Sequence, residues 1–409
     1  MEKKKLLITT DSFLPRLDGV SIFIREILPY LKQKYEITII APDFKDERDN
    51  ENKDNENKDN ENKKEEETNE TKESNEIKII RMPLTKKITL RITGSSDMPF
   101  SKPNKKIIKK EIEKNNIIFN QAIGPIGKTA ILESAKLKKP IVSFIHSIDW
   151  ELASKSVKRF GKLVRIYVKI RAIKLYNKCN FLITPTKEVK SILENEGIKT
   201  KKKIASLGVN TEKFHPTPDK SKAKEEIGIE PTKTVIGYCG RIGREKNLET
   251  LKKAFENLNK EFPETILLIV GKGTEEQMTE LKGKNIILTG IKENTVLYYQ
   301  AMDIFVLPSL TETTSFSTLE AMSCGIPVIV THVGYLKEYI QKGINGFFFP
   351  KKSTYGLKKR LKELITDTEK RESMGRLARK TIITNHRWEK RTEEIINILD
   401  TARNKRKVD

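Results

Sequence analysis

Short apolar runs alternate with amphipathic stretches along this chain, and the alternation starts twice. The first series opens with the run Lys5–Thr10, a loop that contains Gly19, and an amphipathic stretch from about Val20. The second opens at Thr234 with TVIGYCG, followed by an amphipathic stretch from Asn247 and the run TILLIVG. Strands that alternate with helices form parallel sheets covered by helices, and a restart indicates a second sheet. We therefore predict an α/β protein with two Rossmann-like, doubly wound domains.

The boundary between the two series lies near Asn210–Pro216, and 409 residues suffice for two domains of ordinary size. We expect a first domain over residues 1–212 and a second over 213–386. An amphipathic helix is expected within the remaining residues, 387–409.

A low-complexity segment interrupts the first domain at about 46–76. The motif DNENK occurs three times in succession from Asp49, and no aliphatic or aromatic residue stands between Arg48 and Asn75. Such a segment has no apolar surface whose burial could offset the entropy of ordering it. We predict a disordered loop here.

The net charge of +23 is unevenly distributed. Segment 46–76 carries 14 acidic and 6 basic residues, a net −8, which leaves +31 on the rest of the chain. A body this basic attracts phosphate groups, acidic lipids or nucleic acid. No RNA-binding aromatic motif, zinc finger or helix-turn-helix pattern accompanies the basic residues, so no nucleic acid partner is expected. A basic nucleic-acid-binding protein without enzyme activity stays as the alternative from a different class.

The cysteines and the apolar stretches bear on location. Cys179, Cys239 and Cys324 lack the spacing of metal or redox sites. No stretch approaches the roughly 20 apolar residues that a membrane span needs. These features favour a reducing, cytoplasmic setting.

Two glutamates eight residues apart, Glu312 and Glu320, stand in the stretch PSLTETTSFSTLEAMSCGIPVIV. The first lies in a polar loop, and the second lies on the same side of a helix that begins near Thr314 and Ser315. Exposed amides at the start of this helix can bind a phosphate. The arrangement predicts a site that holds a sugar with one carboxylate and a ribose with the other.

Other candidate residues follow or precede predicted strands and helices. Arg241 and Lys246 lie in the loop after TVIGYCG, where two cations can stabilise the charge that grows on a leaving diphosphate. Gly19 lets a phosphate approach the amides of the helix that follows it. His146 comes directly after the predicted strand Pro140–Ile145, at the strand end where ligands bind in doubly wound sheets.

These motifs resemble those of a known family. E-x7-E followed by A-M-x-x-G-x-P-V-I, and G-R-x-x-x-E-K at 240–246, are similar to the signatures of retaining nucleotide-sugar glycosyltransferases of family 4, which have the GT-B fold. D-G-V-S at 18–21 is especially similar to the diacylglycerol glucosyltransferases of that family, which also includes phosphatidylinositol mannosyltransferases. The family usually has Phe-Gly where this chain has Thr314 and Ser315, a departure that bears on the choice of sugar more than on the reaction.

The resemblance implies two domains that face each other across a cleft, with the helix in 387–409 returning to the first domain. It implies a sugar donor linked to UDP or GDP, and a leaving phosphate that takes the acceptor proton. No D-x-D motif is evident, so neither an essential metal nor a cofactor is expected. The implied contacts are the diphosphate for Gly19, Arg241, Lys246, Thr314 and Ser315, the transferring sugar for Glu312 and His146, the ribose for Glu320 and the nucleobase for Ile291.

The acceptor is expected to be a membrane lipid, such as a diacylglycerol- or inositol-type glycolipid precursor. Residues 151–180 predict one long helix whose apolar side is flanked by basic residues, which suits the surface of an anionic bilayer. We therefore expect a peripheral protein on the cytoplasmic face of a membrane. A soluble or polysaccharide acceptor stays open, as does an ordinary solvated helix face. The basic residues are Lys155, Lys158, Arg159, Lys162, Arg165 and Lys169.

Overall fold

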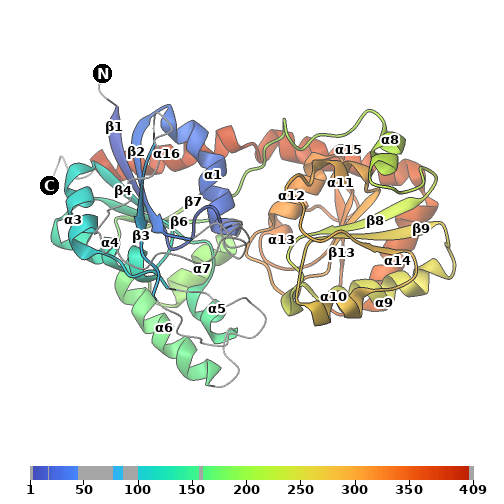
Figure 1. Cartoon of the computed structure of the whole chain (residues 1–409), viewed down its shortest axis with the longest axis horizontal. Helices are drawn as coiled ribbons and strands as arrows, with labels where there is room; N and C mark the ends of the chain where they lie inside the picture. The colour runs from blue at the N-terminus through green and yellow to red at the C-terminus, as the bar shows by residue number, and fades with distance from the viewer. Residues whose placement is uncertain (1–2, 17, 45–76, 86–99, 156–159, 405–409) are drawn as a thin grey trace, which may run out of the picture. The chain divides into compact units, whose positions relative to one another are not determined.

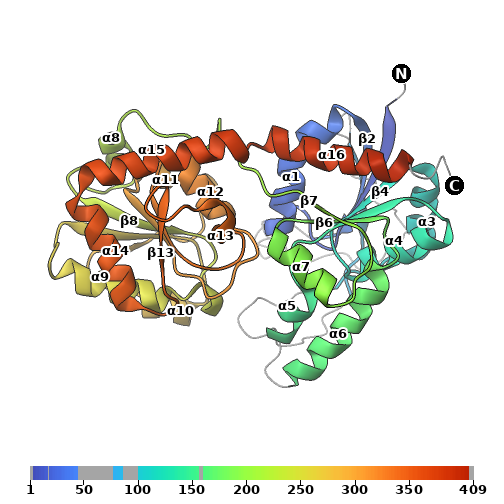
Figure 2. The same cartoon turned by 180° about the vertical axis from the view of Figure 1, so that it is seen from behind.

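The computed structural model of this chain describes residues 3–16, 18–44, 77–85, 100–155 and 160–404 (Figures 1 and 2). The loop predicted at about 46–76 lies outside these residues. The chain separates into two compact units. The first comprises Met1–Ala205 and Thr392–Asp409, and the second comprises Ser206–Arg391.

The first unit contains, within its described residues, a seven-stranded parallel sheet of order β3-β2-β1-β4-β5-β6-β7. Helices cover both faces of the sheet (Figure 1). The strands are β1 (Lys4–Thr9), β2 (Tyr35–Pro42), β3 (Ile77–Met82), β4 (Ile117–Asn120), β5 (Ile141–Phe144), β6 (Phe181–Thr184) and β7 (Lys202–Ile204). The helices are α1 (Gly19–Lys32), α3 (Lys105–Lys114), α4 (Pro125–Lys136), α5 (Asp149–Lys155), α6 (Gly161–Tyr176) and α7 (Lys187–Asn195).

The second unit contains a six-stranded parallel sheet of order β10-β9-β8-β11-β12-β13, also covered on both faces (Figure 2). Its strands are β8 (Thr234–Cys239), β9 (Thr265–Val270), β10 (Ile286–Leu288), β11 (Ile304–Leu307), β12 (Val328–Thr331) and β13 (Gly346–Phe349). Its helices are α8 (Lys220–Glu226), α9 (Leu248–Asn259), α10 (Glu275–Leu281), α11 (Val296–Ala301), α12 (Phe316–Ser323), α13 (Leu336–Tyr339), α14 (Thr354–Thr366) and α15 (Thr368–Asn385), with a 3-10 turn at Arg244–Lys246.

The last helix, α16 (Trp388–Asn404), begins in the second unit, and its residues from Thr392 belong to the first. Ile395 and Leu399 are fully buried. Asp400 accepts hydrogen bonds from Lys4 Nζ at 2.9 Å and from the Tyr35 hydroxyl at 3.2 Å. These contacts attach the helix to the starts of β1 and β2.

Both sheets have the pattern that the alternating sequence predicts. Every residue of β4, β5, β6, β11 and β12 is buried, as expected of parallel strands covered by helices on both faces. In each sheet the strand order reverses once, between β1 and β4 and between β8 and β11. The prediction of two doubly wound sheets is confirmed.

The segment predicted as one long helix over 151–180 forms two helices instead. Helix α5 ends at Lys155 and α6 begins at Gly161, after Phe160 in a left-handed conformation with φ of 60°. A Cβ atom at Gly161 would lie 2.9 Å from the carbonyl oxygen of Ser154, so the start of α6 rests directly on α5. A continuous helix is incompatible with this contact.

Candidate active site

The loops after β8 and β11 meet at the point where the strand order of the second sheet reverses. The amide of Leu310 donates to the carbonyl of Glu245 at 2.8 Å, and Asn247 Nδ2 donates to the carbonyl of Pro308 at 3.2 Å. Doubly wound sheets bind ligands at the carboxyl ends of their strands at such a reversal. This edge is therefore the candidate active site of the second unit.

Lys246 and Glu312 form an ion pair at this edge. Lys246 Nζ lies 2.5 Å from Glu312 Oε1, and the Ser309 hydroxyl donates to the same oxygen at 2.8 Å. The side chain of Glu312 is 8% exposed and that of Lys246 is 21% exposed. The predicted phosphate-binding cation and the predicted sugar-binding acid thus lie side by side.

The backbone of Glu312 rests on Gly334. A Cβ atom at residue 334 would lie 2.0 Å from the carbonyl oxygen of Glu312, and Gly334 has φ of 50°, which side chains disfavour. The amide of Tyr335 donates to the carbonyl of Thr313 at 3.1 Å. The loop that carries the candidate acid is therefore positioned by the turn after β12.

Arg241 lies on the same turn as Lys246 and pairs with Glu245. Its side chain is 58% exposed. The buried Tyr238 hydroxyl donates to the carbonyl of Arg241 at 2.7 Å. Burial raises the pKa of Tyr238, and the negative charges of Glu312 and Glu245 raise it further. Both candidate cations are thus neutralised by carboxylates, a pairing that the sequence analysis did not anticipate.

Three further candidates lie in α12 or directly before it. Ser315 is the N-cap, and its hydroxyl accepts from the amide of Thr318 at 3.3 Å, while Thr314 is partly exposed beside it. Glu320 lies on α12 and accepts a hydrogen bond from the Tyr299 hydroxyl of α11 at 2.7 Å. No sequence signal marks Tyr299, which is fully buried, as a partner of Glu320.

Ile291 follows β10 and is 68% exposed. The neighbouring Gly290 accepts a hydrogen bond from the amide of Gly271 at 2.9 Å. A Cβ atom at Gly271 would lie 1.9 Å from the carbonyl oxygen of Gly240, so the loops after β8, β9 and β10 are adjacent. Ile291 is therefore an apolar surface residue at the same edge of the sheet.

In the first unit, the amides beside Gly19 already have an acidic partner. Asp18 is the N-cap of α1, and its Oδ1 accepts from the amides of Val20 and Ser21, both at 3.0 Å. Apart from its chain neighbours and the backbone of its own helix, no residue that the structure describes has an atom within 4 Å of a Cβ built at Gly19. A phosphate at these two amides has to displace the Asp18 carboxylate.

His146 follows β5 and packs against two aromatic rings that also contact each other. Its ring centroid lies 4.9 Å from that of Phe23 and 4.6 Å from that of Phe144. His146 Nε2 lies 3.0 Å from Gln121 Oε1, which follows β4. Burial lowers the pKa of His146 to about 3, so the imidazole is neutral at physiological pH.

Two carboxyl groups that the sequence analysis did not select lie in the same unit. Asp11 accepts from the amides of Ile126 at 2.8 Å and Gly127 at 3.1 Å, at the start of α4, and burial raises its pKa. Asp149 accepts from the Tyr176 hydroxyl at 2.5 Å, and burial raises its pKa to about 6. The charge of Asp11 contributes to that rise.

The structure describes only part of the basic face that the sequence predicts on residues 151–180. Arg165 Nε donates to Glu151 Oε1 at 2.7 Å, and Lys169 pairs with Glu196. Lys162 is exposed, whereas Lys158, Arg159 and the side chain of Lys155 lie outside the description. What is exposed is an apolar face: Leu152, Phe160, Leu163, Ile166, Tyr167 and Ile170 are each at least 50% exposed.

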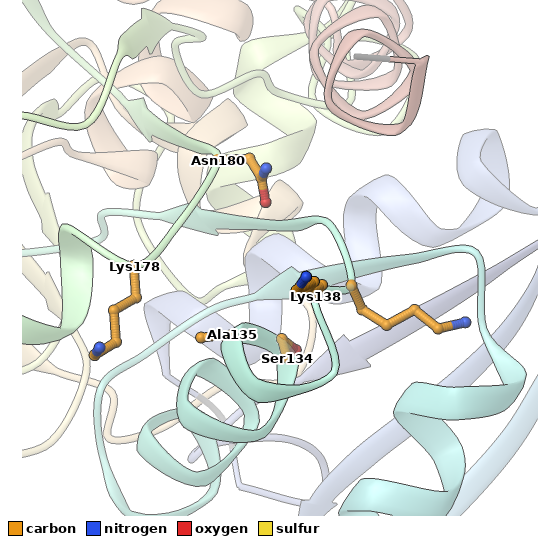
Figure 3. A pocket seen from close by; sticks show the side chains of 6 residues that line it. Ser134, Ala135, Lys138, Lys178 and Asn180 are labelled. Atoms are coloured by element: carbon orange, nitrogen blue, oxygen red, sulfur yellow. The ribbon is translucent and has the colours of Figure 1, made fainter. Parts of the chain in front are cut away.

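A surface cavity of about 230 Å³ lies elsewhere (Figure 3). Its lining includes Lys138 and Lys178, which precede β5 and β6, so it opens at the amino-terminal ends of these strands. His146 lies beyond the opposite end of β5. The ammonium of Lys139, which also lines the cavity, donates to the carbonyls of Glu113 at 2.7 Å and Asn115 at 2.9 Å. The cavity is therefore separate from the candidate site.

In the part of the chain that the structure describes, no helix combines the length and apolarity needed to cross a bilayer.

Two family descriptions match the chain: "Glycosyl transferases group 1" over residues 219–381 and "Glycosyltransferase Family 4" over residues 17–213. The chain is 32% identical to the sulfoquinovosyl transferase SQD2 of Arabidopsis thaliana over 48% of its own length, and the match spans only 39% of that protein. It is 27% identical to the alpha-monoglucosyldiacylglycerol synthase of Acholeplasma laidlawii, over 65% of this chain and 69% of that one.

Solved structures share the fold at low sequence identity. The structure of HepE from Anabaena, determined with UDP and glucose, matches with a TM-score of 0.70 and 16% identity, over 97% of this chain and 99% of that one. The likeness shows that the chain shares the fold of this structure.

Proposed function

Because the chain belongs to the group 1, family 4 glycosyltransferases of GT-B fold, we propose that it transfers a hexose from a nucleoside diphosphate sugar to an acceptor hydroxyl and retains the anomeric configuration. The donor carries UDP or GDP. The observation that supports this best is the Lys246–Glu312 ion pair at the edge where the loops after β8 and β11 meet. In the proposed reaction Lys246 serves the diphosphate side of the bond that breaks, and Glu312 serves the sugar side.

The two cations and the two acids have complementary tasks in the proposed reaction. Arg241 and Lys246 leave their carboxylate partners to bind the diphosphate, assisted by the amides at Thr314 and Ser315 and by the approach that Gly19 permits. Glu312 then accepts hydrogen bonds from sugar hydroxyls, and His146 contacts the same sugar. Glu320 binds the ribose, and Ile291 borders the nucleobase.

The chemistry exchanges one bond at the anomeric carbon. The bond from that carbon to the diphosphate oxygen breaks with its electron pair going to the diphosphate. A bond to the acceptor oxygen forms on the same face, and the acceptor proton passes to the leaving phosphate oxygen. Fixed positive charge at Lys246 and Arg241 stabilises the diphosphate as its charge grows.

Calorimetric titration of the full-length protein with UDP and, separately, GDP tests the donor site. One of the two is expected to bind, and Arg241→Met is expected to weaken that binding tenfold to a hundredfold, because a hydrogen bond to a charged group contributes about 1.5–3 kcal/mol. Arg376→Met is the matched control, since Arg376 is an exposed arginine with its own glutamate partner on α15. Absence of binding by both nucleotides would overturn the proposal.

The acceptor proposed is a lipid at a membrane surface, of the diacylglycerol or inositol type. The apolar face defined above supports this, because one large apolar side chain of α5, four of α6 and that of its N-cap Phe160 are exposed to water. Each contributes about 1.5–3 kcal/mol when it is fully removed from water. A bilayer interface accepts such a face, and the basic body of the chain favours an anionic surface. Alpha-monoglucosyldiacylglycerol synthases among the relatives agree with a lipid acceptor.

Sedimentation with phosphatidylglycerol vesicles that contain diacylglycerol tests the acceptor. The double variant Leu163→Gln/Ile170→Gln is expected to bind vesicles at least tenfold more weakly, because it removes two apolar side chains from the face. A double variant of Tyr355→Gln and Leu377→Gln, also exposed but in the second unit, is expected to bind as the parent does. If the protein does not bind the vesicles and transfers sugar equally well to soluble glycans, the proposal of a lipid acceptor is wrong. The proposal of a glycosyltransferase would still stand.

A further inference from the structure

The environment of His146 determines which of its two ring nitrogens carries a proton. The ring is one of three mutually packed aromatic rings, together with Phe23 and Phe144, and these contacts restrict its rotation. Its Nε2 lies 3.0 Å from Gln121 Oε1, within hydrogen-bond distance. In the described part of the chain no hydrogen bond to Nδ1 is found. The side chain of Gln121 is therefore the group that selects the tautomer.

The orientation of the Gln121 amide follows from its own contacts. Gln121 is 2% exposed, and its backbone amide donates to the carbonyl of Thr9 at 2.9 Å. Its side-chain Nε2 points to the carbonyl of Phe119 at 3.5 Å. The reversed amide would place two oxygens, Oε1 and that carbonyl, against each other. The oxygen of the Gln121 side chain therefore faces the histidine and can only accept a proton.

We propose that Gln121 is a positioning residue that holds His146 in the Nε2–H tautomer, so that Nδ1 offers a lone pair to a hydroxyl of the bound sugar. This rests on the proposed function, in which His146 contacts the transferring sugar. The imidazole then acts as an acceptor from the sugar rather than as a donor to it. Burial keeps the ring neutral, which leaves the Nδ1 lone pair available at physiological pH.

The tautomer is measured directly, without substrate, on the full-length protein labelled with ¹⁵N-histidine. Multiple-bond ¹H–¹⁵N spectra distinguish protonated from unprotonated ring nitrogens, and His146→Gln assigns the signal among the four histidines of the chain. The parent is expected to show Nε2–H alone. Gln121→Met is expected to raise the population of the Nδ1–H form roughly fivefold to tenfold, because it removes the hydrogen bond that favours the other tautomer.

Kinetic measurements with the sugar donor show whether Gln121 positions His146 for the reaction or has only a structural role. Gln121→Glu keeps an oxygen facing Nε2 but adds a negative charge, which raises the pKa of His146. Its kcat/KM is expected to match the parent at pH 8 and to fall on the acidic side, where protonation of Nδ1 removes the lone pair. For Gln121→Met, kcat/KM is expected to be about tenfold lower than in the parent at every pH. Gln300→Met is the matched control, since Gln300 lies in the second unit and donates to the carbonyl of His215.

Four outcomes decide between the explanations. A parent with Nδ1 protonated, or a tautomer population unchanged in Gln121→Met, overturns the inference whatever the activity is. Equal loss of activity in Gln121→Glu and Gln121→Met at pH 8, with both variants folded, also overturns it. If the protein gives the expected spectra but transfers no sugar, Gln121 does fix the tautomer of His146. In that case only the proposed function is refuted.

Discussion

Replacing Lys246 by methionine is expected to lower kcat/KM for sugar transfer by about 10²–10³-fold. The substitution removes a cation that the proposed mechanism places against the diphosphate as it leaves, and loss of one such group has an effect of this size. It also leaves Glu312, a nearly buried carboxylate, without its ionic partner. Breaking a buried pair from one side costs about 3–5 kcal/mol, so the free energy of unfolding in urea is expected to fall as well.

A second substitution shows whether low activity persists in a variant whose stability has recovered. The double variant Lys246→Met/Glu312→Gln no longer holds an unpaired charge, so its free energy of unfolding is expected to recover, whereas its activity is expected to stay low. Lys253→Met is the matched control, because Lys253 forms an ion pair with Glu249 on the exposed face of α9. If the double variant regained activity together with stability, Lys246 would have only a structural role.

Replacing Gly334 by alanine is expected to lower kcat/KM by about 10²-fold, although residue 334 contributes no functional group. The added Cβ atom would stand 2.0 Å from the carbonyl oxygen of Glu312, so the loop has to move. Displacement of a reacting group by about 1 Å can cost 10²-fold in rate. Steady-state kinetics with the sugar donor measure the loss.

Gly343→Ala is the control that separates the effect of backbone strain from the effect of the steric clash with the Glu312 carbonyl. Gly343 has φ of 80°, but among the described residues other than its chain neighbours none has an atom within 4 Å of a Cβ built there. Both variants are expected to lose about 1–2 kcal/mol of stability from the left-handed conformation. Only Gly334→Ala is expected to lose activity, and an equal loss in both would show that the site does not depend on the contact with Glu312.

Much of the fold follows from local sequence. The apolar runs of β5, β6, β11 and β12 are short, uninterrupted and separated by helical stretches, which is why the two parallel sheets were predicted correctly. The break between α5 and α6 was not, because apolar periodicity continues across it. It depends on the contact of Gly161 with Ser154, and no periodic pattern reports a contact of this kind.

The sequence selected candidate residues for the site but did not predict which of them pair. Lys246 and Glu312 were selected from separate motifs, each for its own ligand. Their contact joins residues 66 positions apart and depends on the pairing of β8 with β11, which brings Gly237 opposite Phe305. Gln121 escaped selection because an isolated glutamine carries no motif, and only the folded neighbourhood shows that it faces His146.

The division of the chain has a consequence for its synthesis. Ribosomes release residues in order, so all six strands of the second sheet emerge before the part of α16 that packs on β1 and β2. Until then Lys4 and Tyr35, at the starts of those strands, lack their hydrogen-bond acceptor Asp400. The side chains of Ile395 and Leu399, which are fully buried in the finished protein, have not yet been added. The unit encoded first is thus completed last, and a nascent chain carries an unfinished apolar surface throughout translation of residues 206–391.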